Sequence, residues 1–169
     1  MKKESRQDVV QRLTREHRLL ERAVSGLSES ELTQVPVLDH WTIKDILAHI
    51  LAWNEEYTPE IDRVLQGNGL WQKRFASRGG EDEFNRKVVE RHKNNSVQEV
   101  IVRWQESFKA LIKKVESLTD EEWNFQSSGD KWEDGTPVTV YSLFLYEYEG
   151  SEHEGGHAKQ ILRWKKGRR

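Results

Sequence analysis

The stretch WTIKDILAHILAW, residues 41–53, decides the expected fold. Thr42 with Asp45 three residues later predicts the start of a long helix. A mostly apolar stripe then recurs at the spacing of one helical face, through Ile43, Leu47, Ile50, Asn54, Tyr57, Ile61 and Val64. We expect Pro59 to kink this helix or to end its first part, and Gly67-Asn68-Gly69 to end it.

Three further segments carry the same helical spacing. The first stripe comprises Val10, Leu13, His17, Leu20, Val24 and Leu27, and the third comprises Val97, Ile101, Trp104, Phe108, Leu111, Val115 and Leu118. The last helix is expected to begin at Thr136-Pro137, with proline in the first helical position, and to run to about Trp164. Short capped pieces are expected from Ser28 and Thr119, and a shorter helix from Glu81 to His92. Ser96 with Glu99 predicts a further capping box at the start of the third long helix.

These segments predict an all-α fold, a four-helix bundle in a single domain over residues 1–169. The long connection from 67 to 95 fits a crossover between the second and third helices. Its loop, residues 67–80, contains Trp71 and Phe75. Because two exposed aromatic residues in a long loop are unusual, we expect this loop to fold over another part of the protein.

Composition narrows the classes of function. Charged residues make up 33% of the 169 residues, and the signs are mixed to a net charge of -2, so we expect neither a nucleic-acid nor a membrane partner. The basic end, Arg163 to Arg169, is expected to be a helix C-terminus whose cations complement the helix dipole. The chain has no cysteine, which excludes disulfides and thiolate metal sites. We expect no signal peptide and a cytoplasmic location.

His153 and His157 lie four residues apart on the last predicted helix. Residues at this spacing share one face, so their imidazoles can chelate one metal ion. Gly155 and Gly156 lie between them, and each costs a helix about 0.5–1 kcal/mol against alanine. Two such residues indicate close approach by another helix, a loop or a ligand; the alternative is a tolerated weakness at a bend.

A third ligand is expected from another element, and His49 lies within an apolar run of the second helix. Its alternative role is that of a buried histidine with an ordinary hydrogen bond. Three neutral imidazoles would leave the full charge of a divalent ion and an open coordination position, as in catalytic sites. Zinc or nickel suits such nitrogen ligands.

Several neighbours complete the candidate site. Glu56 and Glu149 could orient a ligand or act as a general base, although a solvated helix carboxylate is the alternative. Trp53, Tyr57 and Trp104 are the candidate pocket walls. Of the other histidines, His17 is expected in the core or behind a ligand, and His40 and His92 on the surface.

Residues 41–53 resemble the second-helix signature of the DinB-like superfamily, and HEGGHAKQI, residues 153–161, resembles its fourth-helix signature. The resemblance implies a four-helix bundle, often a homodimer, with a three-histidine metal site on His49, His153 and His157. Some members are thiol-dependent transferases or isomerases that use a low-molecular-weight thiol. The ClbS/DfsB branch, whose members detoxify reactive electrophiles, is similar through Glu83-Phe84-Asn85 and residues 96–111.

The leading hypothesis is therefore a metal-dependent enzyme in which the metal activates water or a low-molecular-weight thiol against a small electrophilic substrate, as a hydrolase or an S-transferase. Because the chain has no cysteine, any thiol has to come from a cofactor. A second hypothesis is a non-catalytic protein that binds or sequesters a small molecule. A third is a structural bundle whose histidines only form hydrogen bonds.

Overall fold

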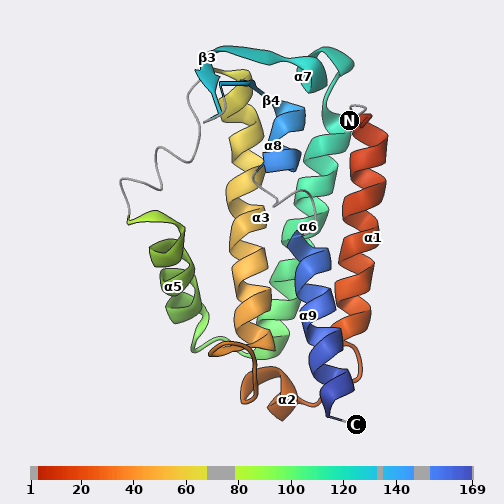
Figure 1. The fold of residues 1–169 in the computed structure, drawn as a ribbon, viewed down its shortest axis with the longest axis vertical. Helices are drawn as coiled ribbons and strands as arrows, with labels where there is room; N and C mark the ends of the chain where they lie inside the picture. Colours follow the sequence, from red (N-terminus) through yellow and green to blue (C-terminus); the bar gives the residue numbers. More distant parts are fainter. Residues whose placement is uncertain (1–3, 68–78, 133–134, 147–152, 169) are drawn as a thin grey trace.

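The computed structural model describes residues 4–67, 79–132, 135–146 and 153–168. Four longer helices run side by side: α1 (Arg6–Val24), α3 (Ile43–Leu65), α6 (Val97–Ser117) and α9 (His153–Gly167) (Figure 1). α3 packs against α6 and α1 packs against α9, and contacts of α1 with α6 and of α3 with α9 join the two pairs. Within each pair the helices run in the same direction, opposite to that of the other pair (Figure 1).

Of the shorter helices, α2 and α7 lie at the two ends of these four, α5 lies on one side, and α8 lies above α9, between α3 and α6 (Figure 1). They are α2 (Glu29–Thr33), α5 (Gly80–His92), α7 (Asp120–Asn124) and α8 (Val140–Tyr146). Two antiparallel strand pairs are also present: β1 (Pro36–Leu38) with β2 (Trp41–Thr42), and β3 (Gln126–Lys131) with β4 (Pro137–Thr139). Helix accounts for 74% of the described residues, so the fold is mostly helical, as expected, and the two short strand pairs are an addition to it.

Side-chain caps fix where the helices begin. The capping boxes expected at Ser28, Thr42, Ser96 and Thr119 are all formed, and Ser5 with Asp8 adds one at the start of α1. The expected start at Thr136-Pro137 is wrong, because Pro137 lies in β4 and α8 begins at Val140. There the Thr139 hydroxyl accepts the backbone N–H of Ser142 at 2.9 Å. Pro59 lies within α3, which continues to Leu65.

α3 is the central helix of the fold. Its apolar residues are buried along most of its length, and those from Ile46 to Asn54 are buried on every side. Burial of each Ile or Leu side chain stabilises the fold by about 1.5–3 kcal/mol. Because α5, α6, α8 and α9 all contact α3, a polar residue on α3 is placed deep inside the protein.

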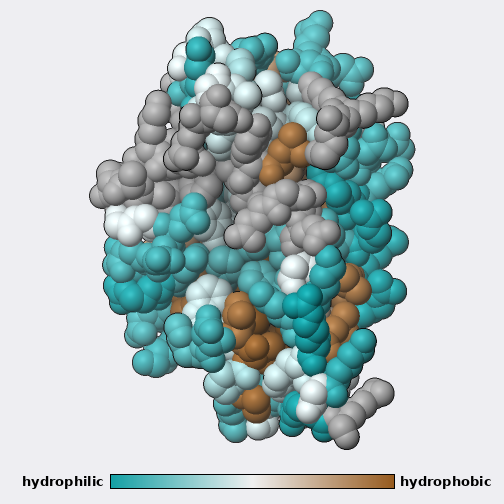
Figure 2. All heavy atoms as spheres, in the orientation of Figure 1, coloured by the Kyte–Doolittle hydropathy of each residue, from teal (hydrophilic) through white to brown (hydrophobic). Residues whose placement is uncertain are grey.

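The surface matches the charged composition. The face in Figure 2 is mostly hydrophilic, with hydrophobic residues gathered in a few small areas, most of them in its lower half. None of the helices in the described residues has the length and apolar character needed to cross a membrane. The loop residues Trp71 and Phe75, and the middle of the predicted fourth helix at 147–152, lie outside the described residues.

Candidate metal centre

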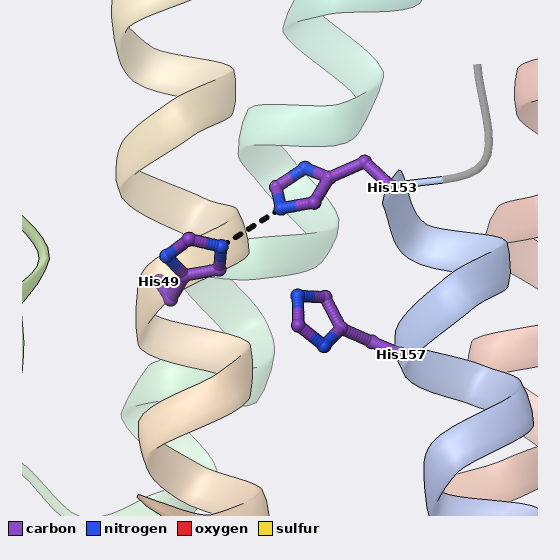
Figure 3. A group of neighbouring side chains, drawn as sticks. All are labelled: His49, His153 and His157. Carbon is purple, nitrogen blue, oxygen red and sulfur yellow. Dashed lines mark hydrogen bonds between the residues drawn. The ribbon is translucent and has the colours of Figure 1, made fainter. Parts of the chain in front are cut away.

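Three histidines converge between α3 and α9. His49 projects from α3, and His153 and His157 project from the first turns of α9 toward it (Figure 3). The Nε2 atoms of His49 and His153 are 2.8 Å apart, and one ligand atom from each of the three residues lies within 4.8 Å of the others. The fold therefore brings together residues that are 104 positions apart in the chain.

The backbone around His153 and His157 allows α9 to lie close to α1. A Cβ atom on Gly155 would be 3.1 Å from Cγ of Glu16 on α1, closer than ordinary van der Waals contact. The glycine expected to mark a close helix approach does so at this position. A Cβ atom on Gly156 would meet no other atom within 4 Å among the described residues, so no contact accounts for the second glycine.

Side-chain amides hold two of the three imidazoles. Asn85 Oδ1, from α5, is 3.0 Å from Nδ1 of His49 and accepts the indole N–H of Trp53 at 3.1 Å. Gln160 Oε1 is 2.8 Å from Nδ1 of His157. Because both Nδ1 atoms contact amide oxygens, Nε2 is the atom through which His49 and His157 would bind a metal. Sequence reasoning missed Asn85 and Gln160, since a single amide on a polar helix gives no periodic signal.

Burial disfavours protonation of two of the three imidazoles, those of His49 and His153. It lowers the pKa of His49 from the usual 6.5 to about 3, and the nearby His157 adds to this effect while the hydrogen bond to Asn85 opposes it. Burial also lowers the pKa of His153 well below its usual value, reinforced by His49 and His157. Metal ions bind neutral imidazole, so a site that disfavours protonation is suited to a cation.

The donor set fits a divalent transition metal. Two imidazole ligands of a tetrahedral zinc ion have nitrogen atoms about 3.3 Å apart, given Zn–N distances of about 2.0–2.1 Å. The pair formed by His49 and His153, at 2.8 Å, would have to open by roughly 0.5 Å. A small rotation of two side chains supplies such a change. Three neutral nitrogen ligands without a thiolate suit zinc or nickel.

A cavity of about 310 Å³ opens onto the three imidazoles. Trp53 and Tyr57, two of the expected pocket walls, line it, together with residues that sequence reasoning missed: Leu38, Trp41, Glu81, Asn85 and Gln160. Glu56 is half-buried on α3 and is not in this lining. Glu149 lies outside the described residues. Glu81 is the carboxylate that the described residues place at the cavity.

Trp104 does not line the cavity, contrary to expectation. It is fully buried in α6, and its indole N–H donates to Oε1 of Glu154 at 3.0 Å. The other carboxylate oxygen of Glu154 is 2.8 Å from Nδ1 of His17, whose ring stacks on Phe108. His17 is therefore a core residue, as expected. Glu154, between the two histidines of α9, ties that helix to α1 and α6.

The two histidines expected at the surface differ in burial. His40 is exposed, as predicted. His92 is not a surface residue, because only 2% of it is exposed. It lies four residues after the fully buried Val88, so it shares the inner face of α5. The polar residues around it in the sequence belong to the outer face.

Comparisons with known proteins agree with this architecture. The family model of the DinB superfamily matches residues 12–161. No curated protein matches the sequence significantly. A Streptococcus pneumoniae protein of solved structure is similar, with a TM-score of 0.72 at 14% identity over 98% of this chain and 93% of that one. A Clostridium difficile 630 protein has a TM-score of 0.67 at 16% identity over 98% of both chains.

A third similar structure is that of the colibactin self-resistance protein ClbS, solved in complex with double-stranded DNA. Its TM-score is 0.69 at 10% identity, over 96% of both chains. At these identities the structural similarities show the fold alone. Because the family match spans most of the sequence, this chain belongs to the DinB superfamily.

Proposed function

We propose that this protein binds one divalent ion, zinc or nickel, on His49, His153 and His157, and is a metal-dependent enzyme acting on a small electrophilic molecule. The observation that carries the proposal is the convergence of three imidazoles at the wall of a cavity. When bound, the ion would supply Lewis-acid activation of water or of a low-molecular-weight thiol, for hydrolysis or thiol transfer. The thiol would be a separate molecule, because the chain has no cysteine.

The residues of the chain have distinct roles in this proposal. Burial keeps His49 and His153 neutral, and Asn85 and Gln160 orient His49 and His157. Trp41, Trp53 and Tyr57 form an aromatic wall that excludes water and contacts the apolar part of a substrate. Glu81 is placed to exchange a proton with a group in the cavity, and Glu149 stays a candidate for that role.

The test compares the metal-free and the metal-loaded protein in hydrolysis and thiol-transfer screens. We expect activity only with metal, lost in His153→Ala and retained in His40→Ala, whose histidine is exposed. If removal of the metal leaves every reaction unchanged, the enzymatic proposal is wrong.

The second candidate is capture of an aromatic or hydrophobic compound without turnover. The aromatic wall favours it, and one protein of similar fold, ClbS, is a self-resistance protein. Calorimetry with candidate compounds would give saturable binding without product. Trp41→Ala should weaken that binding, since stacking on an indole is lost.

Partners and assembly belong to the same proposal. We take α1, α3, α6 and α9 as a four-helix bundle in one domain, with the chain between α3 and α6 as its crossover, and the family resemblance implies a homodimer. We propose a small molecule, not nucleic acid, as the ligand. Because ClbS was solved with DNA, a duplex-binding assay is the necessary check. The cations exposed on neighbouring α1 and α9 would be the face to mutate if binding occurs: Arg15, Arg18, Arg22, Lys159 and Arg163.

A further inference from the structure

The hydrogen bonds around Asn85 determine which nitrogen of His49 carries the proton. The indole N–H of Trp53 can only donate, and it lies 3.1 Å from Asn85 Oδ1, which identifies that atom as the acceptor. Nδ1 of His49 is 3.0 Å from the same oxygen, and the indole nitrogen of Trp53 is 3.2 Å from this Nδ1. An unprotonated Nδ1 and the amide oxygen would be two acceptors that repel each other at 3.0 Å. The contacts are therefore best satisfied with the proton on Nδ1 and with the indole N–H, which reaches both atoms, directed to the oxygen. A carbonyl oxygen has two lone pairs, so it can accept both donors.

The consequence lies on the other side of the ring. In a neutral imidazole with a proton on Nδ1, Nε2 holds the lone pair. Nε2 of His49 is the atom that faces His153 at 2.8 Å. Asn85, held by Trp53, therefore presets His49 as a metal ligand.

Asn85 also belongs to the seam, the contact surface between α5 and α3 that holds α5 in place. α5 has 13 residues and packs mainly on α3. A helix of this length is marginal in isolation, so its position depends on its docking contacts. Val88 is fully buried, and Phe84 packs edge-on to Trp53 with 4.9 Å between ring centroids. Asn85 lies between these two apolar contacts and supplies hydrogen bonds of the seam to α3.

We infer that Asn85 is a positioning residue that couples metal binding at the three histidines to the docking of α5 on α3. The coupling rests on the proposed function in that it requires a metal at His49. A cation on Nε2 withdraws electron density from the ring, so the Nδ1–H becomes a stronger donor and its bond to Asn85 strengthens. By linkage, docking of α5 raises metal affinity by the same factor as the metal stabilises docking.

This coupling matters because α5 forms one wall of the cavity. Asn85 and Glu81 of α5 both line it, and Trp53, which Asn85 holds, lines it from α3. Metal binding would therefore also fix the shape of the substrate pocket. If α5 were undocked, the cavity would lose the polar side chains of Asn85 and Glu81, and the indole N–H of Trp53 would lose Asn85 Oδ1 as an acceptor.

The experiment measures two quantities on the full chain. Zinc affinity is measured by competition with a chromophoric chelator, and amide hydrogen exchange over residues 80–92 is measured with and without zinc. The variants are Asn85→Ala, which removes the acceptor, and Asn85→Asp, which keeps an oxygen for both donors. Arg86→Ala is the matched control, because Arg86 is exposed and its guanidinium pairs with Glu83 of the same helix.

We expect zinc to slow exchange in α5 of the wild type and of Arg86→Ala. Asn85→Ala should bind zinc about 10–100-fold more weakly, the usual effect of losing a residue that orients a ligand, and zinc should no longer protect its α5. Asn85→Asp should restore both properties, because a carboxylate also accepts from both donors. Circular dichroism confirms that each variant folds.

The possible failures have different meanings. If the wild type binds zinc, but Asn85→Ala binds it equally tightly or α5 is not protected by zinc, the coupling is wrong and the metal site stands. If the wild type binds neither zinc nor nickel, the proposed function is wrong and the coupling falls with it. In that case the exchange of metal-free protein still reports on the docking of α5. Faster exchange in α5 of Asn85→Ala than of the wild type would show that Asn85 holds α5 on α3 without any metal.

Discussion

His49 and His153 face each other across the contact of α3 with α9, with their Nε2 atoms 2.8 Å apart. Burial lowers the pKa of both residues, so the contact joins two neutral rings. This contact depends on how closely α9 packs against α1 and α3. The same two histidines are the candidate metal ligands, so their burial affects both the stability of the protein and its ability to bind a metal.

The stability of the metal-free protein should fall as the pH falls below about 6.5. An unfolded histidine takes up a proton near pH 6.5, whereas His49 in the folded state does so only near pH 3. Between these values the unfolded state binds more protons, so acid favours unfolding by up to about 1.4 kcal/mol per pH unit for each such histidine.

Urea denaturation at about pH 7.5 and about pH 5.5, on either side of the ordinary histidine pKa, measures this effect. His49→Gln should reduce the slope of stability against pH, and His40→Gln, at an exposed position, should leave it unchanged. An unchanged slope in His49→Gln would contradict the assigned lowering of the pKa.

The two glycines of α9 should respond in opposite ways to substitution. Gly156→Ala should stabilise by about 0.5–1 kcal/mol, because the added methyl meets no atom and the helix gains propensity. Gly155→Val should destabilise by about 1–3 kcal/mol, because its side chain would overlap Glu16. Chemical denaturation of the metal-free variants measures both changes in the free energy of unfolding. A stabilising Gly155→Val would show that α1 and α9 are not in close contact.

Replacement of Glu154 should be costly. Glu154→Leu leaves the N–H of Trp104 and the ring nitrogen of His17 without their shared carboxylate, and each unsatisfied buried group costs about 1–3 kcal/mol. Glu154→Gln keeps an acceptor and should cost less. The matched control is Glu106→Leu on the exposed face of α6. If Glu154→Leu and Glu106→Leu unfold at the same urea concentration, the network adds nothing to stability.

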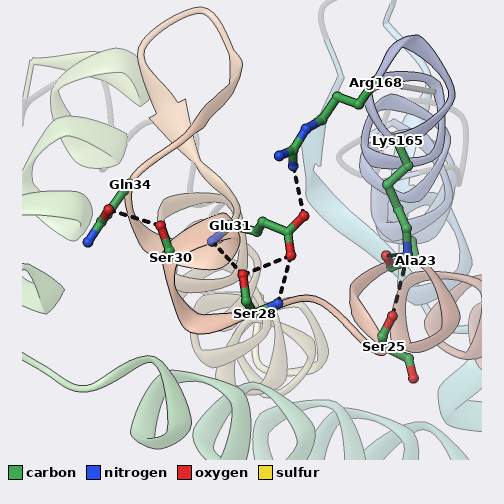
Figure 4. A network of polar contacts seen from close by, with 8 residues as sticks. All are labelled: Ala23, Ser25, Ser28, Ser30, Glu31, Gln34, Lys165 and Arg168. Carbon is green, nitrogen blue, oxygen red and sulfur yellow. Dashed lines mark hydrogen bonds and ion pairs between the residues drawn. The ribbon is translucent and has the colours of Figure 1, made fainter.

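The C-terminal cations attach α9 to the corner between α1 and α2 (Figure 4). Lys165 Nζ donates to the carbonyls of Ala23 at 3.1 Å and Ser25 at 3.4 Å, and Arg168 pairs with Glu31 at 2.9 Å. The end of α9 is thus more than the dipole-complementing tail that the sequence suggests. Lys165→Met should destabilise by about 0.5–1.5 kcal/mol, because two carbonyls at the end of α1 lose a donor.

Thermal denaturation compares Lys165→Met with Lys166→Met, since Lys166 is exposed. Equal melting temperatures for the two variants would show that the contacts of Lys165 with α1 contribute no stability.

Local chemistry made much of this structure predictable. Capping pairs such as Thr42 with Asp45 specify helix starts over a few residues, and the apolar stripe of α3 specifies its buried face. His153 and His157 share a face by spacing alone, so one half of the candidate site follows from the sequence. The choice of His49 as their partner needed its position in an apolar run and the family resemblance.

The remaining features depend on contacts between distant segments. Asn85 reaches His49 only because α5 docks on α3, and nothing in the charged sequence of α5 marks that face. The aromatic character of Trp104 suggested a pocket wall. Its contact with Glu154 arises only because the fold brings α6 and α9 together, and it cannot be read from the sequence. The strands β3 and β4 lie in a polar stretch without alternating apolar residues, so no periodic signal predicted them.

The most direct test of the central claim is elemental analysis of the untagged protein, purified without chelator, beside His49→Ala, His153→Ala and the surface control His40→Ala. We predict about one zinc or nickel ion per chain in the wild type and in His40→Ala, and none in the other two variants. An absence of metal from the wild type after incubation with zinc and with nickel, or metal retained in His49→Ala and His153→Ala, would contradict the three-histidine site.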